Sequence, residues 1–323
     1  MKAIGIILAG GNNKMMKELS NKRAIAAMPV AGSYRSIDFA LSNMSNSKIQ
    51  KVAVITQYNA RSLNEHLSSS KWWNFGRKQG GLFLFTPTVT ADNSDWYRGT
   101  ADAMYQNIDF LKRRHEPYVI ISSGDCVYKL DFNRVLDFHI EKKSDITVVC
   151  KDMMYNDDVS RFGVVRMDDE SRITEFDEKP IEASSNTIST GIYVIRRRQL
   201  IELLEAAAEE NRFDFVNDIL VRYKNVKKIY GYKINSYWNN IADIDAYFKT
   251  NMDFLRPDVR SYFFREEPTI CSKVDDLPPA KFNPGSDISN SLVSSGCIIN
   301  GSVEDSVLFK QVFVGKNTTV KNC

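Results

Sequence analysis

Short apolar runs alternate with amphipathic stretches along the first 150 residues of the chain. The runs with the length of buried strands are Ala3–Leu8, Lys51–Thr56, Tyr118–Ser122 and Asp145–Cys150. Between them, apolar residues recur at helical spacing, first at Ile37, Leu41 and Met44 and later at Ala103, Ile108 and Leu111. This alternation is typical of a mostly parallel sheet covered by helices, and it predicts an α/β domain.

The pattern changes to β structure between Phe162 and Arg196, and helical spacing resumes from Gln199. The expected strands are Phe162–Val165, Ile173–Phe176 and Gly191–Ile195. From Arg256 to Pro284, proline and polar residues break the periodicity, which indicates a linker. We therefore predict a first domain over residues 1–255 and a linker over residues 256–284.

The last segment, residues 285–323, has a different periodicity. Leu308, Val314 and Val320 recur every six residues, as do Cys297 and Val303, among small and turn-forming residues. This spacing predicts the coils of a parallel β-helix, and a β-rich tail with accidental spacing is the alternative. The run ends after a few coils, and an unfinished solenoid exposes its last coil. We expect either further residues or a partner at that end.

Composition limits the possible partners and compartments. A chain of 323 residues with 43% hydrophobic content can bury a large core, and a net charge of +3 argues against nucleic acid or an anionic membrane as partner. The five cysteines are scattered, which argues against a disulfide framework or a zinc site and favours a reducing compartment. The N-terminus enters a strand directly, without a signal peptide, so we expect a cytoplasmic protein.

A glycine pair, Gly10-Gly11, follows the first strand where a phosphate-binding loop is expected. Such a loop needs glycines for close approach of backbone N–H groups, and a cation to offset the phosphate charge. Asn13 and Met15 stand where a third glycine and an arginine would be expected. Ligands of open α/β sheets bind beyond the carboxyl ends of the strands, where Asp125 also falls, so one pocket can hold both motifs. A tight turn and a structural carboxylate are the plainer alternatives.

Ordered motifs along nearly the whole chain resemble ADP-glucose pyrophosphorylase. They are Ala24–Val30, Gly32–Asn43, Thr56–Tyr58, Trp96–Ala103, Gly124–Asp131, Glu178–Pro180, Ser189–Tyr193 and Tyr237–Ile241. The resemblance implies a Rossmann-like nucleotidyltransferase domain followed by a left-handed parallel β-helix. It also implies the family's reaction, in which ATP and glucose 1-phosphate give ADP-glucose and pyrophosphate for glycogen synthesis.

The resemblance implies a magnesium site that this chain lacks in part. The family holds Mg²⁺, which its reaction requires, with one aspartate in the block matched by Asp125 and another in the block matched by Asn240. A neutral amide is a poor Mg²⁺ ligand, because the ion prefers carboxylates and water. We therefore interpret Asp125 as a vestigial metal ligand and expect no tightly bound cofactor.

The nucleotide side of the pocket has also lost the residues that the family uses. Besides Asn13 and Met15, the family's Ala-Lys-Pro is here Ala24-Ile25-Ala26, so Ile25 replaces a phosphate-directed ammonium. The residues that still match are interpreted as a vestigial nucleotide site, namely Gly10, Gly11, Gly99, Thr100 and Asp102.

The sugar side is better preserved. Residues that match the family's sugar-phosphate pattern are Glu178, Lys179, Ser189 and Asp214. A basic cluster near the altered loop is a solvated face or a site for a phosphorylated effector, and consists of Lys14, Lys17, Lys22, Arg23 and Arg35.

These losses predict a catalytically deficient, regulatory subunit of the family that assembles with an active paralogue, as in some Gram-positive bacteria. We expect a mixed tetramer, because folding and pairing need no metal site. One alternative is a functioning nucleotidyltransferase that uses Asp125, Asp243 and substrate oxygens. Another is a sugar-phosphate sensor without an enzyme partner.

Overall fold

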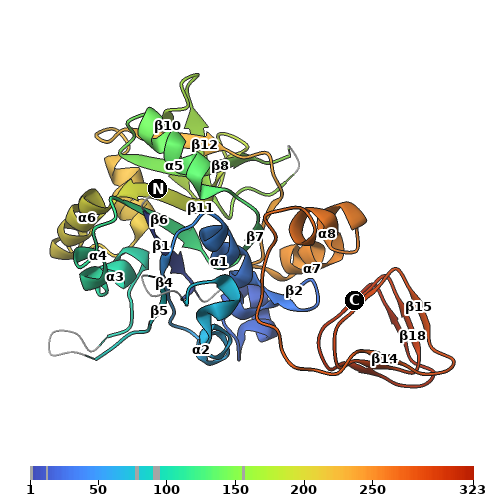
Figure 1. Ribbon diagram of the computed structural model, residues 1–323. Coiled ribbons are helices and arrows are strands. Elements are labelled where there is room, and N and C mark those ends of the chain that lie inside the picture. The colour runs from blue at the N-terminus through green and yellow to red at the C-terminus, as the bar shows by residue number, and fades with distance from the viewer. Residues whose placement is uncertain (1–2, 12–13, 77–79, 90–94, 155–156) are drawn as a thin grey trace.

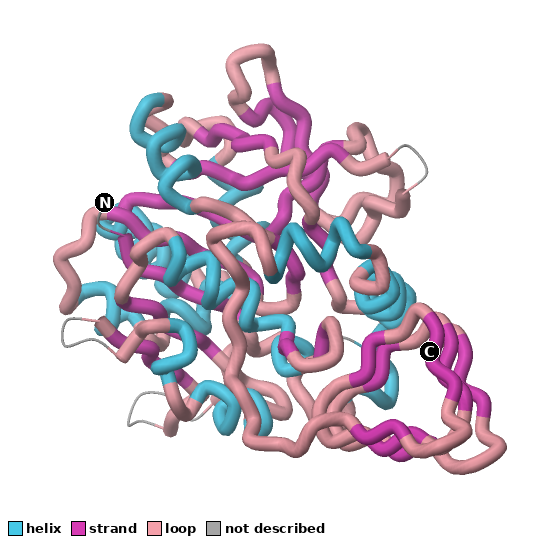
Figure 2. Tube along the Cα trace, turned by 45° about the vertical axis from the view of Figure 1, so that its right-hand side comes forward, coloured by secondary structure: helices cyan, strands magenta, loops and turns pink. Residues whose placement is uncertain are grey.

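The computed structural model describes residues 3–11, 14–76, 80–89, 95–154 and 157–323. Within these residues a nine-stranded sheet forms the centre of the molecule, with helices on both of its faces (Figure 1). A separate three-sided coil of short strands carries the C-terminus (Figure 2). The predicted combination of an α/β domain with a mostly parallel sheet and a C-terminal parallel β-helix is confirmed.

The sheet has a parallel part and an antiparallel part. The parallel strands lie in the order β6, β1, β4, β5, and their bounds are β1 Ala3–Leu8, β4 Lys51–Ile55, β5 Gly81–Phe85 and β6 Tyr118–Ser123. The long strand β11 pairs antiparallel with β6, β8 and β9, and β12 runs parallel to β8. The bounds in this part are β8 Ile146–Asp152, β9 Gly163–Met167, β10 Ile173–Glu178, β11 Thr187–Arg196 and β12 Ile229–Lys233.

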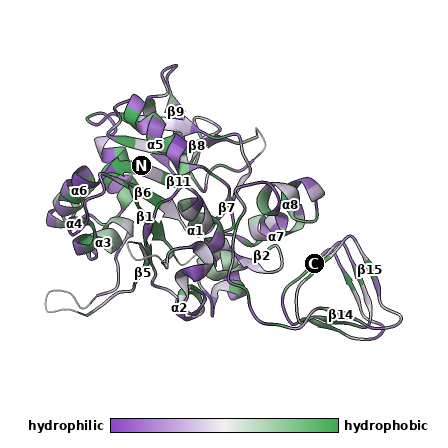
Figure 3. Ribbon diagram, in the orientation of Figure 1, coloured by the Kyte–Doolittle hydropathy of each residue, from purple (hydrophilic) through white to green (hydrophobic). Residues whose placement is uncertain are grey.

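All seven strands expected from apolar runs are present in the sheet, whereas β5 and β12 were not predicted. Alternate residues of β1 point to opposite faces, so Ile7 packs on one face and Ile4 and Ile6 on the other. Apolar colour concentrates in these strands, and polar colour lies on the outer surfaces of the helices (Figure 3).

Helices cover both faces of the sheet. One face is covered by α1 Ser36–Asn46, α2 Arg61–Leu67 and α5 Phe132–Glu141, and the other by α3 Thr100–Tyr105, α4 Ile108–Lys112, α6 Arg197–Glu209 and the π-helical turn η4 Val216–Val221. The apolar spacing around Ala103 and Leu111 belongs to two short helices, because the chain leaves helical geometry at Asn107 (φ −109°, ψ 22°).

A third apolar cluster joins the sheet domain to the segment that follows it. The cluster draws on 3₁₀ turns η1 Lys14–Ser20 and η2 Ile25–Ala27, hairpin β2 Pro29–Val30 and β3 Tyr34–Arg35, strand β7 Cys126–Tyr128, and helices α7 Ile244–Asp253 and α8 Pro257–Phe264. It also includes Tyr237 and Ile241, the two residues that flank strand β13 Trp238–Asn240. Helix α8 corrects the expectation of an irregular linker from residue 256. The expectation depended on the proline and polar content of the stretch, but Pro257 stands in the first turn of α8, where proline is favoured. Val259 and Phe263 are buried in the cluster.

The C-terminal strands form parallel ladders on three sides of a coil (Figure 2). Their bounds are β14 Lys281–Phe282, β15 Asp287–Ser289, β16 Leu292–Val293, β17 Ile298–Ile299, β18 Ser302–Glu304, β19 Val307–Leu308, β20 Phe313–Val314 and β21 Thr319–Lys321. Cys297, Val303, Leu308 and Val314 are buried in one core, and Val320 packs against it. The six-residue recurrence is therefore confirmed, although Val303 and Leu308 are only five residues apart.

None of the helices among the described residues combines the length and the apolar content that a bilayer crossing requires. All five cysteines are free thiols, of which Cys126, Cys150 and Cys297 are buried.

Candidate functional site

Two adjoining cavities open beyond the carboxyl ends of β1 and β6. The glycine-side cavity, of about 440 Å³, is lined by Gly10, Gly11, Gln57, Gly99, Thr100 and other residues. The lysine-side cavity, of about 560 Å³, is lined by Arg161, Glu178, Lys179, Ser189, Asn240 and others. The residues that line both are Gly11, Ile25, Ser123, Asp125, Gly191, Tyr193 and Val216. Gly10 and Asp125, which were expected to face one pocket, both line the glycine-side cavity. Asp125 also lines the lysine-side cavity, so it borders both halves of this double cavity.

The two glycines after β1 have different surroundings. A Cβ on Gly10 would lie 3.2 Å from the Cβ of Gln57, so Gly10 allows the loop to pack closely on its neighbour. A Cβ on Gly11 would meet nothing within 4 Å, so the backbone there is open to a ligand. Asn13 lies outside the described residues.

The loop before α3 is held by its contact with Phe213. A Cβ on Gly99 would come within 2.3 Å of the Phe213 carbonyl oxygen, which accepts the backbone N–H groups of Ala101 (2.8 Å) and Asp102 (3.2 Å). Gly99 and Thr100, which were predicted to belong to a nucleotide side, line the glycine-side cavity. Thr100 Oγ1 also accepts the backbone N–H of Phe215 at 2.8 Å.

Two predicted binding residues do not line either cavity. Asp102 is buried and accepts hydrogen bonds from the backbone N–H of Arg98 (2.8 Å) and from Gln106 Nε2 (3.0 Å), so it shapes the loop from behind. Asp214 Oδ1 accepts the backbone N–H of Asn217 at 2.7 Å, in the turn that begins η4. Their matching motifs could not reveal which backbone groups these carboxylates engage, because those partners are brought together only by the fold of each loop.

Asp125 and Asn240 are brought together by the pairing of two short strands. Asn240 lies opposite Cys126 in the antiparallel pair of β13 and β7. The amide Nδ2 of Asn240 donates to Cys126 Sγ (3.4 Å), and the thiol donates to Asp125 Oδ1 (3.5 Å). Ser123 Oγ donates to the same carboxylate oxygen. Burial, reinforced by Asp125, raises the pKa of the Cys126 thiol, so it stays protonated and can donate.

This arrangement does not fit the magnesium ion that the resemblance implies. Asn240 Oδ1 accepts the backbone N–H of Ala242 at 2.9 Å, so the amide oxygen is engaged and its NH₂ group faces the thiol. Of the two positions at which the resemblance implies a Mg²⁺ ligand, Asp125 carries a carboxylate and Asn240 does not. Among the described residues, no group of three or more His, Cys, Asp or Glu side chains is placed to hold a metal ion.

Asp243, the alternative metal ligand, is engaged elsewhere. Its side chain caps α7 by accepting the backbone N–H of Ala246 at 2.9 Å, and it forms an ion pair with Arg161. Asp243 does not line either cavity, and its partner Arg161 does line the lysine-side cavity.

The predicted sugar-side residues Glu178, Lys179 and Ser189 do meet in the lysine-side cavity. Burial raises the pKa of Glu178. The ammonium of Lys179 lies 3.5 Å from the Glu178 carboxylate and partly offsets this increase in pKa. Lys179 adopts a left-handed backbone conformation (φ 50°), which is uncommon for a residue with a side chain and often marks a functional site. Ser189 Oγ donates to Tyr193 Oη at 3.3 Å.

The altered positions place apolar groups where cations were expected. Ile25 is 5% exposed and lines both cavities, and Met15 lines the lysine-side cavity. Among the described residues that line the cavities, the cationic side chains are Arg98 on the glycine side and Arg161 and Lys179 on the lysine side.

Sequence reasoning missed Arg161, Gly191 and Tyr193. The available signal for Gly191 and Tyr193 was their place in the motif Ser189–Tyr193. Gly191 has φ 74° where the pairing of β11 shifts register between Ser189 and Tyr193. No sequence pattern pointed to Arg161, because only folding brings it from the start of β9 to the cavity.

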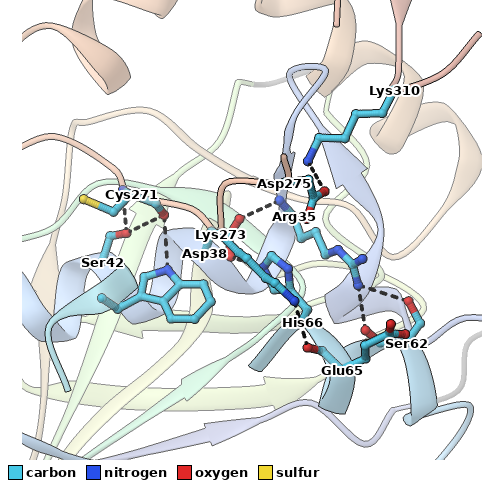
Figure 4. A network of polar contacts seen from close by, with 11 residues as sticks. Arg35, Asp38, Ser42, Ser62, Glu65, His66, Cys271, Lys273, Asp275 and Lys310 are labelled. Carbon is cyan, nitrogen blue, oxygen red and sulfur yellow. Dashed lines mark hydrogen bonds and ion pairs between the residues drawn. The ribbon is translucent and has the colours of Figure 1, made fainter. Parts of the chain in front are cut away.

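The residues of the predicted basic cluster do not share one environment. Arg35 turns inward, and its Nη1 donates to the carbonyl oxygen (2.7 Å) and Oγ (3.0 Å) of Ser62 (Figure 4). Burial and nearby Arg23 lower the pKa of Arg35. Lys14, Lys17 and Lys22 are exposed, and none of them lines the two cavities.

Comparison with known proteins matches the sheet domain and the C-terminal β-helix to two separate family models. A family model described as nucleotidyl transferase matches residues 4–256, and one described as GlmU-like, C-terminal hexapeptide matches residues 278–323. The chain is 39% identical over 322 residues to a glucose-1-phosphate adenylyltransferase of Pseudothermotoga lettingae, covering 99% of this chain and 76% of that protein. It is 37% identical over 320 residues to the enzyme of that name from Clostridium novyi, covering 98% and 84%. For the one from Geobacillus stearothermophilus the identity is 35% over 323 residues, covering 99% and 83%.

Proposed function

The chain belongs to the glucose-1-phosphate adenylyltransferase family, and we propose that within it this protein is a catalytically deficient, regulatory subunit. In this role it modulates an active paralogue that makes ADP-glucose and pyrophosphate from ATP and glucose 1-phosphate. The observation that carries the proposal is the hydrogen-bonded chain of Asn240, Cys126 and Asp125, which lines the lysine-side cavity and reaches the glycine-side cavity at Asp125.

The physical reason for the proposed lack of activity is the charge of the side chains around the cavities. Transfer of a nucleotidyl group depends mainly on positioning and on neutralising the charge of the phosphates. Ile25 and Met15 contribute no positive charge to the cavities, and Asn240 contributes no negative charge for a cation. Loss of a single charge-stabilising group typically costs on the order of 10²–10³ in rate. Such losses are not additive, but several together leave little for catalysis.

The chain's own residues can still bind part of a substrate. Gly11 leaves open backbone at the glycine side, and Glu178, Lys179 and Ser189 converge at the lysine side. A carboxylate suits the hydroxyl groups of a sugar, and an ammonium suits a phosphate. We propose that the cavity holds a sugar phosphate without converting it.

The proposal includes a partner. The active paralogue supplies the chemistry, and a mixed tetramer in the cytoplasm is the assembly that we propose. A subunit can shift its partner's conformation without a metal site, provided that it binds the two conformations differently. A phosphorylated effector remains a proposed ligand of the basic residues, although Arg35 is engaged with Ser62.

A second candidate is an active glucose-1-phosphate adenylyltransferase, and the names of the relatives favour it. In this alternative Asp125 and substrate oxygens would suffice for the reaction. The engagement of Asp243 with Arg161 and with the start of α7 weighs against that residue as the additional ligand.

A pyrophosphate-release assay with ATP, glucose 1-phosphate and magnesium tests the proposal. The purified chain alone is expected to give no turnover, and adding it to the active paralogue is expected to raise or lower that enzyme's rate. Turnover by the chain alone would instead support the second candidate. If the chain gives no turnover and has no effect on the paralogue, both the regulatory subunit and the active enzyme are contradicted. The remaining possibility is then a sugar-phosphate sensor.

A further inference from the structure

A third cavity, of about 300 Å³, lies beside the glycine-side cavity and has no part in the function proposed above. We call it the tryptophan-side cavity, and it is lined by Gln57, Thr86, Thr88, Asp95 and Trp96 together with two apolar residues. Gln57 also lines the glycine-side cavity, so the two cavities adjoin. Gln57 follows β4 and Thr86 follows β5, which places this cavity beyond the carboxyl ends of both strands. Ligands of open α/β sheets bind at this edge.

The ring of Trp96 is held at this cavity and remains largely open to solvent. Trp96 is 60% exposed and stacks on Tyr58, with ring centroids 5.9 Å apart and ring planes 12° from parallel. The next residue is fixed, because Tyr97 donates its backbone N–H to Gln57 Oε1 (2.7 Å) and its carbonyl oxygen accepts Gln57 Nε2 (3.3 Å). Tyr58 and Val89 are also exposed, so Trp96 belongs to an apolar patch. Exposed patches of this kind mark binding surfaces.

The polar groups of the tryptophan-side cavity suit an uncharged ligand that is rich in hydroxyl groups. Among the described residues that line it, none is a lysine, an arginine or a histidine, so a phosphate would find no cation there. The carboxylate of Asp95 repels an anion and can accept hydrogen bonds from hydroxyl groups. Thr86 and Thr88 carry hydroxyls that donate and accept, and Thr88 Oγ1 donates to the Thr86 carbonyl oxygen at 3.1 Å.

We propose that the tryptophan-side cavity binds a pyranose ring of a neutral saccharide, with Trp96 as the stacking surface. The C–H groups on one face of a pyranose pack on the electron-rich face of an aromatic ring. Its hydroxyl groups lie around the rim of the ring, where Thr86, Thr88 and Asp95 can bond to them. The volume lies at the lower end of the range for small-ligand pockets, ~300–1,000 Å³. This site is separate from the double cavity, because Trp96 lines neither half of that cavity.

Calorimetric titration of the full chain with glucose, maltoheptaose and cellohexaose at millimolar concentration tests this proposal. Binding of an oligosaccharide is expected, and the two oligomers distinguish an α-linked from a β-linked source of the ring. Trp96→Ala is expected to weaken binding about tenfold or more, because the stacking surface is lost. Trp96→Phe keeps a smaller ring and is expected to give an intermediate affinity. Phe313→Ala is the matched control, because Phe313 is 67% exposed on the β-helix, far along the chain from this cavity.

Tryptophan fluorescence gives a second readout that a merely structural role of Trp96 would not produce. Covering the exposed indole with a saccharide is expected to shift its emission to shorter wavelength. This shift should be absent in Trp96→Phe, even where calorimetry still detects binding. Circular dichroism checks that the variants are folded. Failure of all three saccharides to bind, or unchanged affinity in Trp96→Ala, overturns the proposal. If the saccharides fail to bind and Trp96→Ala changes the sedimentation of the chain, the exposed patch is a protein interface instead.

Competition separates this site from the double cavity. Glucose 1-phosphate in excess is expected to leave the affinity for the oligosaccharide unchanged, because the cations that suit its phosphate line the other cavities. Displacement of the oligosaccharide by glucose 1-phosphate would place both ligands in the double cavity and overturn the proposal. Turnover by the chain alone contradicts the regulatory role and has no bearing on saccharide binding at Trp96.

Discussion

Asn240 differs from an aspartate only by an NH₂ group in place of one oxygen, yet this exchange changes the chemistry of the whole site. The NH₂ group donates toward Cys126, whereas a carboxylate would face the thiol and Asp125 with a second negative charge. Nearly identical shape lets the fold accommodate either residue, and the amide is a poorer Mg²⁺ ligand than a carboxylate because it is neutral. The sequence motif revealed the substitution, but the thiol between the two groups became apparent only in the structure.

A buried histidine gives a prediction at the same scale. His139 is 1% exposed, and its Nδ1 lies 2.8 Å from Thr147 Oγ1. Burial, with a further contribution from Arg196, lowers its pKa from 6.5 to about 4. Between these pH values the unfolded chain binds a proton that the folded protein does not, so stability falls as the pH falls. The loss approaches about 3 kcal/mol near pH 4.

Urea unfolding at several pH values between 7 and 4 measures this effect. His139→Gln is expected to be less stable at pH 7 and to show a flatter pH dependence below 6.5. His115→Gln is the control, because His115 is exposed, and it should keep the wild-type profile. If both variants show the same pH dependence of stability, titratable groups other than His139 cause the loss of stability at low pH.

At the scale of elements, the cavities are lined by loops that follow strands. The backbone conformation of these loops is held by close contacts with neighbouring segments. The strands that end at the site were predictable because buried parallel strands are continuous apolar runs. Helix α8 was missed because Pro257 has opposite meanings in the first turn and in the interior of a helix. The break between α3 and α4 was missed because the apolar spacing continues across it.

Gly99 provides the test of these loop contacts. Gly99→Ala would place a Cβ 2.3 Å from the Phe213 carbonyl oxygen, so the loop or η4 must move. We expect a loss of about 1–3 kcal/mol in the free energy of unfolding, as for other overpacked sites. Gly11→Ala is the matched control, because its Cβ would meet nothing within 4 Å, and its stability should change little. Denaturant unfolding of both variants measures the difference, and equal stability would contradict this account.

At the scale of the whole molecule, the segment between α8 and the β-helix is tied to the sheet domain. Ser42 Oγ donates to the Cys271 carbonyl oxygen (3.1 Å) and accepts its N–H (2.9 Å), and Trp73 Nε1 donates to the same carbonyl oxygen (3.2 Å). Farther along, Lys310 of the β-helix pairs with Asp275 at 2.7 Å (Figure 4). The hairpin also meets the β-helix, where a Cβ on Gly32 would lie 2.5 Å from Ser294 Oγ. These contacts connect the sheet domain, the segment after α8 and the β-helix.

Ser42→Ala tests this connection. The variant leaves the N–H of Cys271 without its partner, which costs about 1–2 kcal/mol. We expect amide hydrogen exchange around Cys271 to become about tenfold faster, while exchange in the central sheet stays unchanged. Ser68→Ala is the control, because Ser68 Oγ donates at the exposed end of α2. Unchanged exchange at Cys271 would mean that other contacts hold the segment.

The sequence by itself determined the fold class and the coil of the C-terminal segment, and it singled out Asn240 and Ile25, which line the cavities. These features depend on local periodicity and on which side chain occupies a motif, and both can be read along the chain. Only the tertiary structure decided that Asp102 and Asp214 lie outside the cavities, that Arg161 enters one, and that Cys126 joins Asp125 to Asn240. The reason is that side-chain direction and neighbours depend on strand register and loop packing, which join residues far apart in the sequence.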